Sequence, residues 1–186
     1  MSRLFLTKLH LWLAALLFPA MLLFLITGAL YTWGITGKTD NTERTVIIAA
    51  PLSADNEAAL RQIASSELAK AGLSEPSGKA RVRKASDSFT YEWTGSQRDI
   101  TVEPTDNPLV AKVTIKEASL HRTMVQLHKA KGGDLFKIYA TVLALALFLL
   151  VATGLLIGLK TPPFRRATII GSATGLVAFV ALVVAS

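Results

Sequence analysis

Three long apolar segments dominate the hydrophobic pattern of the chain. Residues 9–33 contain no acid, lysine or arginine, and residues 135–159 and 167–184 are equally apolar apart from Lys137. A helix that crosses a membrane needs about 20 such residues, whereas a cleaved signal peptide has a shorter apolar core of about 7–15 residues. We therefore interpret the first segment as a retained membrane helix, and we expect Pro19 near its middle to kink it.

The region between the first two apolar segments has the pattern of a soluble domain. Apolar residues at helical spacing from Leu60 to Ala71 predict a helix that Ser53 caps and Gly72 ends. Four later stretches alternate apolar and polar residues and predict antiparallel strands. Their apolar positions are Ala80 and Val82, then Phe89, Tyr91 and Trp93, then Ile100 and Val102, and finally Leu109, Ala111, Val113 and Ile115. We expect the aromatic row in the domain core.

A last helix of the soluble region is predicted over residues 118–131, with Leu120, Met124 and Leu127 on one stripe. The predicted fold is thus an α-helical membrane protein with three transmembrane helices and an inserted extracytoplasmic α+β domain, a helix plus an antiparallel sheet. The predicted parts are a first transmembrane helix (1–33), the α+β domain (34–133), a second transmembrane helix (134–160), and a basic cytoplasmic turn with a third transmembrane helix (161–186).

The charges indicate how the chain is oriented. All 13 acidic residues fall between Asp40 and Asp134, so the net charge of +7 comes almost entirely from cations that flank the apolar segments. Lysine and arginine concentrate on the cytoplasmic side of membrane proteins. The cations Arg3, Lys8, Lys160, Arg165 and Arg166 therefore predict a cytoplasmic N-terminus and turn, with the large domain and the C-terminus outside. Cations grouped at the ends of the apolar segments indicate membrane lipid, and not nucleic acid, as a partner.

The chain contains no cysteine, which excludes disulfides, thiolate metal sites, iron–sulfur clusters and covalently attached haem. The remaining nitrogen ligands are three histidines. His10 lies in the first apolar segment, where a titratable residue is a candidate functional site and a candidate axial ligand of haem iron. The alternative is an interfacial histidine that reaches headgroup water. No residue pattern indicates a catalytic site, so we expect no enzyme activity from the chain alone.

His121 and His128 are seven residues apart, which separates them by about 10.5 Å along a helix and argues against one shared metal ion. His128 precedes the second apolar segment on the outer side, and His10 lies on the inner side. One hydrocarbon thickness of about 30 Å separates these levels. His10 and His128 of one chain therefore cannot bind the same iron, and each needs a partner ligand from a second copy or from another protein.

Two pairs of glycines occur four residues apart in the last two apolar segments. Gly154 and Gly158 lie near the end of one, and Gly171 and Gly175 lie near the start of the next. Such pairs let helices approach closely. They indicate packing between these two helices, or alternatively a dimer interface.

Short motifs around the histidines resemble those of the PepSY-associated transmembrane (PepSY-TM) family. The stretch Lys8–Leu13, KLHLWL, and the later LITGAL at Leu25–Leu30 resemble its opening "LHxWL…LTGxL". The stretch Leu127–Leu135, LHKAKGGDL, and VATGL at Val151–Leu155 resemble its "LHxGxxGG…VTGL" element. The helix and sheet between them resemble a PepSY domain. The resemblance extends to about Lys160.

This resemblance implies a multi-pass protein of the bacterial cytoplasmic (inner) membrane with a periplasmic PepSY domain. Larger relatives bind haem b, and some reduce ferric siderophores. Carried over to this chain, His10 and His128 become candidate haem ligands, while His121 has only a weak claim to cofactor binding. The chain would be an electron-transfer component of a membrane reductase, as a homodimer or as a subunit of a larger complex. Its third apolar segment lacks the histidines of the larger relatives. The alternative is a non-catalytic accessory or regulatory subunit whose PepSY domain binds a periplasmic partner.

Overall fold

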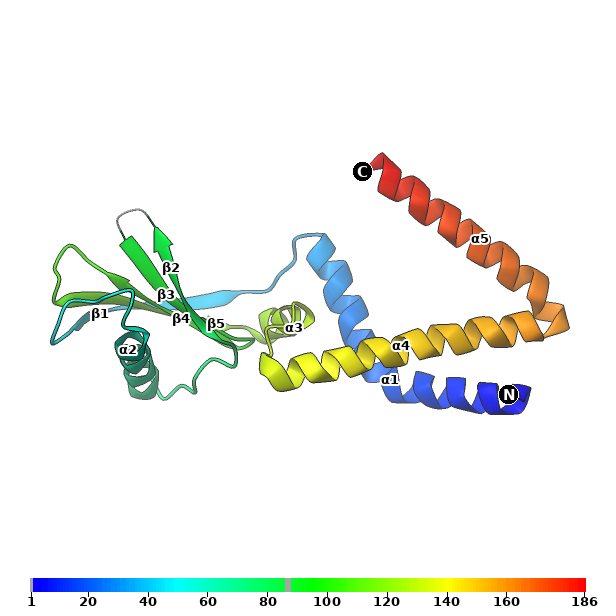
Figure 1. The fold of residues 1–186 in the computed structure, drawn as a ribbon, viewed down its shortest axis with the longest axis horizontal. Helices are drawn as coiled ribbons and strands as arrows, with labels where there is room; N and C mark the ends of the chain where they lie inside the picture. Colours follow the sequence, from blue (N-terminus) through cyan, green and yellow to red (C-terminus); the bar gives the residue numbers. More distant parts are fainter. Residues whose placement is uncertain (1, 86–87) are drawn as a thin grey trace. The chain divides into compact units, whose positions relative to one another are not determined.

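The computed structural model describes residues 2–85 and 88–186 (Figure 1). Within them, three helices are long and apolar enough to cross a membrane, namely α1 (Arg3–Thr32), α4 (Gly133–Lys160) and α5 (Pro162–Ala185). The three apolar helices that the sequence predicts are therefore confirmed. The chain forms two compact units, one of residues 1–21 and 141–186 and the other of residues 22–140.

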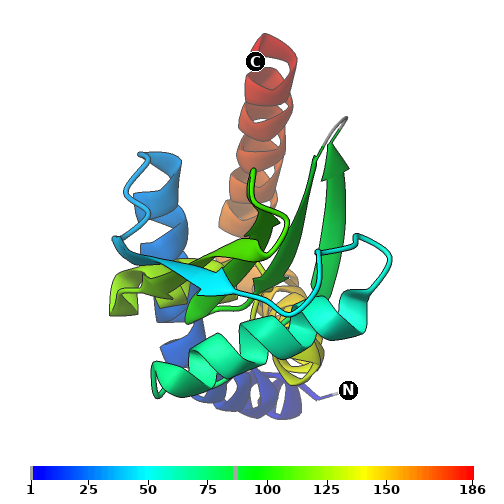
Figure 2. The ribbon, with the colours of Figure 1, turned by 90° about the vertical axis from the view of Figure 1, so that its left-hand side faces the viewer.

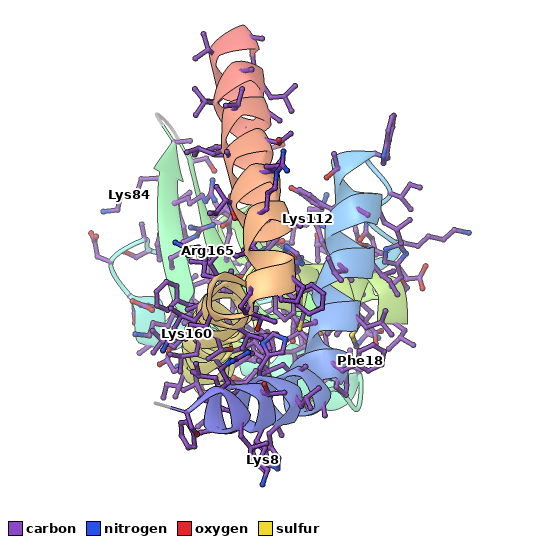
Figure 3. All side chains as sticks on the ribbon, turned by 90° about the vertical axis from the view of Figure 1, so that its right-hand side faces the viewer. Lys8, Phe18, Lys84, Lys112, Lys160 and Arg165 are labelled. Carbon is purple, nitrogen blue, oxygen red and sulfur yellow. The ribbon has the colours of Figure 1, made fainter. Side chains whose placement is uncertain are left out.

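The turn between α4 and α5 is short because two prolines begin the second helix. Thr161 is extended, and Pro162 and Pro163 occupy the first turn of α5, where their missing backbone N–H groups leave no helical hydrogen bond unmade. Lys160 and Arg165 flank this turn (Figure 3). Both cations thus lie where the chain reverses, as a headgroup-level turn requires.

The second unit contains a five-stranded antiparallel sheet of strand order β1-β5-β4-β3-β2. Its strands are β1 (Thr39–Ile47), β2 (Ala80–Ala85), β3 (Ser88–Thr94), β4 (Arg98–Pro104) and β5 (Val110–Ala118). The last four strands agree with the predicted alternating stretches. β1 was not predicted, because it is mostly polar and lies at the sheet edge, where only positions near its end contact the core.

One face of this sheet packs against helix α2 (Glu57–Lys70), which crosses it in Figure 2. Leu60, Ala64 and Leu68 of α2 are fully buried against the strands. Tyr91 and Trp93 join them, so the prediction that the aromatic row lies in the core is confirmed for these two residues. Burial of apolar area of this kind is the main stabilisation that such a domain can obtain.

The cap of α2 differs from the predicted one. Asn56, and not Ser53, is the N-cap, because its side-chain oxygen accepts a hydrogen bond from the Ala59 N–H at 3.1 Å. The Ser53 hydroxyl oxygen instead accepts from the Asp55 N–H in the preceding turn. The other end is as predicted, since Gly72 follows the helix with a φ of +70°, which favours glycine.

The opposite face of the sheet is polar and carries charge pairs. Arg81 and Arg83 both bind Glu92, at 3.0 and 2.9 Å. Helix α3 (Leu120–His128) packs at the end of β5 and leads toward α4. The predicted stripe of α3 is wrong at Leu120, which is 76% exposed, whereas Gln126 is 3% exposed. The buried residues of α3 are Thr123, Val125 and Gln126, so its buried side is part apolar and part polar.

Candidate functional site

His10 of α1 is held by the backbone and side chain of α4. Its Nδ1 lies 3.1 Å from the carbonyl oxygen of Leu150 and 3.1 Å from Oγ1 of Thr153. A carbonyl oxygen only accepts, so Nδ1 must carry the hydrogen. The Thr153 hydroxyl donates to carbonyls of its own helix, at 2.8 Å to Leu149, and its oxygen is thereby free to accept from the imidazole. In the neutral ring, Nε2 then carries the lone pair.

Gly154 explains why the His10 ring lies so close to α4. A Cβ atom built on Gly154 would be 3.1 Å from Cε1 of His10, which is closer than most carbon contacts allow. The absence of a side chain at Gly154 therefore makes room for the imidazole. Thr153, one residue earlier, is only 5% exposed, so its hydrogen bond to the ring is sheltered within the helix pair.

His128, at the end of α3, also contacts a threonine and a glycine, in the other unit. Its Nδ1 lies 3.0 Å from Oγ1 of Thr27 in α1, and the Thr27 hydroxyl donates to the Leu23 carbonyl at 2.7 Å. When the Thr27 hydrogen is directed to Leu23, the Thr27 oxygen accepts from Nδ1 of His128, and Nε2 again carries the lone pair. A Cβ on Gly28 would be 3.2 Å from Cε1 of His128, and the Phe24 ring lies 5.0 Å away, measured between ring centroids.

Each histidine thus rests on a Thr-Gly pair. We call the Thr153-Gly154 pair with His10 the first clamp, and the Thr27-Gly28 pair with His128 the second clamp. Both Thr-Gly pairs belong to the sequence motifs given above, but their contact with the histidines was not predicted. A threonine buried in an otherwise apolar helix, directly before a glycine, is the feature that could have revealed them.

Comparison with known proteins was informative at the level of the family. The family model described as "PepSY-associated TM region" matches residues 1–183. The chain belongs to this PepSY-TM family. No curated protein and no solved structure matches the chain. The family match and the three apolar helices together show that this is a multi-pass membrane protein.

The third histidine of this PepSY-TM protein lies outside both clamps. His121 is in α3, and its Nε2 is buried without a hydrogen-bond partner in the described residues. No group of three or more histidine or carboxylate side chains in residues 2–85 and 88–186 is arranged to hold a metal ion. The structure therefore brings His10 and His128 into matching surroundings and leaves His121 apart from them.

The glycine pairs of the PepSY-TM protein have unequal surroundings. Gly154 faces His10, and a Cβ on Gly158 would collide with the Thr168 side chain of α5. Among the described residues, no atom outside the local helix backbone lies within 4 Å of where a Cβ would be on Gly171 or Gly175. The first pair makes close contacts, to His10 through Gly154 and to α5 through Gly158.

Proposed function

We propose that this PepSY-TM protein is a b-type haem-binding electron-transfer component in which His10 and His128 are axial ligands. The proposal rests on one observation, that the two imidazoles use the same ring nitrogen for their hydrogen bonds to the protein. Each donates from Nδ1 to an oxygen of the neighbouring helix, at 3.1 and 3.0 Å, and has Nε2 available as a lone-pair donor. An Nδ1 hydrogen bond that fixes tautomer and ring orientation is the usual support of a metal-bound histidine.

The donor set also fits haem in its chemistry. Imidazole is a common axial ligand of haem iron, and two neutral nitrogen ligands stabilise an iron that changes its charge by one electron. Haem would supply that one-electron change, while the chain binds it, orients the ligands and excludes water with apolar helices. Glycines beside both rings keep the space next to each imidazole free of side-chain atoms. Apart from the histidine, neither clamp contains a titratable side chain, which agrees with a role in electron transfer.

Each iron requires a second ligand. By the charge pattern, His10 belongs to the cytoplasmic level and His128 to the outer level, so the two ligate different irons. A second copy related by a twofold axis along the membrane normal brings the same histidine to the same depth. We therefore propose a homodimer with one haem at each level, which would form a path for electrons across the bilayer.

The sheet domain fits the outer side in this proposal. Residues 34–133 would be a PepSY-like domain inserted between two membrane helices, in the periplasm of a bacterium with the chain in its inner membrane. Cations flank the turn between α4 and α5 and the start of α1, which supports this orientation. Electrons that reach the outer haem would then serve periplasmic reduction of the ferric-siderophore type.

One observation favours the alternative of a non-catalytic accessory or regulatory subunit. Both imidazoles already make a hydrogen bond between helices, and such a bond is a sufficient reason for a histidine in an apolar segment. In that case the clamps only hold the helices together, and the sheet domain binds a periplasmic partner. The two functions therefore differ in whether Nε2 binds iron.

A visible spectrum of the purified protein separates the two functions. The protein is prepared in mild detergent from cells supplied with haem, and spectra are recorded oxidised and reduced. Haem ligation by two histidines gives a Soret band, with sharp α and β bands on reduction, and His10→Ala or His128→Ala lowers it. A colourless wild-type protein would overturn the haem proposal and leave the accessory subunit.

A further inference from the structure

A polar pocket of about 300 Å³ lies in the sheet unit, and its lining contains no residue of either histidine clamp. Strands β1, β4 and β5, the turn before β4 and helix α3 line it. Its charged lining consists of three cations, Arg98, Lys116 and Arg122, and one carboxylate, Asp99. The lining therefore has an excess of two positive charges in a concave space, where a positive potential is concentrated.

Strand register places Lys116 and Asp99 on the polar face of the sheet. Asn41, Lys116 and Asp99 lie side by side on β1, β5 and β4. They alternate with the core positions of those strands, so their side chains lie on the face opposite α2. Arg122 enters from α3. Arg98 begins β4 on the same strand face as Ile100 and lines the pocket from the end of the strand. The three cations thus come from three separate elements of the fold.

The three cations of this pocket are not neutralised, although others on the same sheet face are. Lys112 binds Glu43 at 3.0 Å, and Arg81 binds Glu92 at 3.0 Å. Among the described residues, no carboxylate oxygen lies within 4 Å of the side-chain nitrogens of the three pocket cations. All three are half-buried, where an unpaired charge attracts a counter-ion more strongly than on an open surface.

Most of the hydrogen-bonding capacity of these cations is unused. Arg98 donates one N–H to the Ser74 carbonyl at 3.0 Å, and Arg122 donates one to the Thr36 carbonyl at 3.4 Å. A guanidinium has five N–H donors and an ammonium has three. Arg98 and Arg122 therefore keep further donors for a ligand, and Lys116 donates to no group in the part of the chain that the structure describes.

A buried amide on the wall of the pocket also indicates a ligand, independently of the cations. Gln126 is only 3% exposed, lines the pocket, and has an Oε1 atom without a hydrogen-bond partner in the described residues. Leaving such a buried group unpaired destabilises the folded state. Rotation of the amide by half a turn exchanges its oxygen and nitrogen, so it can also present N–H donors to a ligand.

We propose that this pocket binds a phosphate group, held by Arg98, Lys116 and Arg122 with the Gln126 amide as a further partner. A tetrahedral oxyanion offers several acceptor oxygens in different directions, which matches donors that converge from three elements. β1 begins seven residues after α1 ends, and α3 ends shortly before α4 begins. The phosphate can therefore come from a lipid headgroup or from a soluble phosphate compound.

Binding measurements on the full chain in uncharged detergent test this proposal. Labelled inorganic phosphate is measured by equilibrium dialysis at low salt, and a short-chain phosphatidylglycerol is measured by native mass spectrometry. The variants are Lys116→Gln and Arg122→Gln, with Lys116→Arg to retain the charge. Lys112→Gln is the matched control, because it removes the same charge from the same strand and face outside the pocket (Lys112 is labelled in Figure 3).

Binding that weakens about tenfold or more in Lys116→Gln and Arg122→Gln, and is unchanged in Lys112→Gln, supports the proposal. Lys116→Arg should restore most of it. Saturable binding of inorganic phosphate would show that the pocket takes a soluble phosphate compound. Binding of the lipid alone would show that it takes a lipid headgroup. Absence of binding for both probes overturns the proposal, as does an equal loss in Lys112→Gln, which would indicate only general electrostatic attraction. None of these binding measurements depends on whether the protein binds haem.

Discussion

The Oγ1 of Thr153 lies 3.1 Å from Nδ1 of His10, in a position where it can only accept the imidazole hydrogen. The same relation between Thr27 and His128, at 3.0 Å, occurs in the other unit. The Nδ1 hydrogen is accepted by the Leu150 carbonyl and the Thr153 oxygen in the first clamp and by the Thr27 oxygen in the second, so Nε2 is the available ring nitrogen in both. The predictions below follow from these clamps, from the domain core and from the charge pattern.

Thr153→Val removes the hydroxyl and keeps the shape of the side chain. We expect a coupling free energy between Thr153 and His10 of about 1 kcal/mol, in the range found for hydrogen bonds between membrane helices. A double-mutant cycle with His10→Ala, using unfolding in mixed micelles, measures it. Thr7→Val is the matched control, since the Thr7 hydroxyl bonds only to the Arg3 carbonyl of its own helix. Equal coupling for Thr7 and Thr153 would contradict the clamp.

Gly154→Ala should destabilise the helix pair, because the added Cβ would lie 3.1 Å from the His10 ring. Gly28→Ala should do the same at His128. Gly171→Ala is the control, since no atom lies within 4 Å of its Cβ position, and alanine is favoured over glycine in a helix by about 1 kcal/mol. Thermal unfolding in detergent should therefore show lower midpoints for the first two variants and no decrease for the third. The opposite order would contradict the packing described above.

Tyr91→Phe should stabilise the sheet domain. The Tyr91 hydroxyl is fully buried and has no hydrogen-bond partner in the described residues, so its removal should raise the free energy of unfolding by about 1 kcal/mol. Thermal unfolding of the full chain in detergent measures the change. A lower midpoint would show that the hydroxyl has a partner.

The same residue predicts a dependence on pH. Burial raises the pKa of Tyr91 from 10.0 to about 12. The folded state then holds the phenol proton more tightly than the unfolded state, so this contribution to stability is complete below pH 10 and is lost as the pH rises to about 12. An absorbance titration of wild type minus Tyr91→Phe should show one tyrosine that ionises late. Ionisation of that tyrosine at the ordinary pKa would contradict its burial.

Single cysteines test the proposed orientation, and the absence of native cysteine removes any background. A maleimide that cannot cross membranes should label Asp106→Cys and Ser186→Cys in intact spheroplasts. Ser2→Cys should react only after the membrane is broken. Labelling of Ser2→Cys but not of Ser186→Cys in intact spheroplasts would reverse the proposed topology.

Local pattern predicted most of the elements because burial there follows the period of the helix or strand. Leu60, Ala64 and Leu68 lie on one helix face, and Tyr91 and Trp93 on one strand face. β1 escaped prediction because it is an edge strand, and its pairing with β5 depends on the backbone and not on an apolar pattern. Asn56 replaced Ser53 as the cap because the choice among nearby polar residues depends on backbone geometry.

The candidate site was predicted only in part, for a similar reason. His10 and His128 are conspicuous as single residues, since histidine is rare in or beside apolar helices. Thr153, the partner of His10, lies 143 residues away in the sequence, and Thr27, the partner of His128, lies 101 residues away. No local period connects residues so far apart, and the chain must fold before the Thr-Gly pairs and the histidines meet.

Haem content per chain tests the central claim most directly. It is measured by conversion to the pyridine complex, in protein from cells supplied with haem. The account predicts about one haem per chain in the wild type, about half in His10→Ala and in His128→Ala, and none in the double variant, since each iron takes one histidine from each copy. His121→Ala should retain the full content. A wild-type protein without haem, or unchanged content in both single variants, would contradict the assignment of His10 and His128 as ligands.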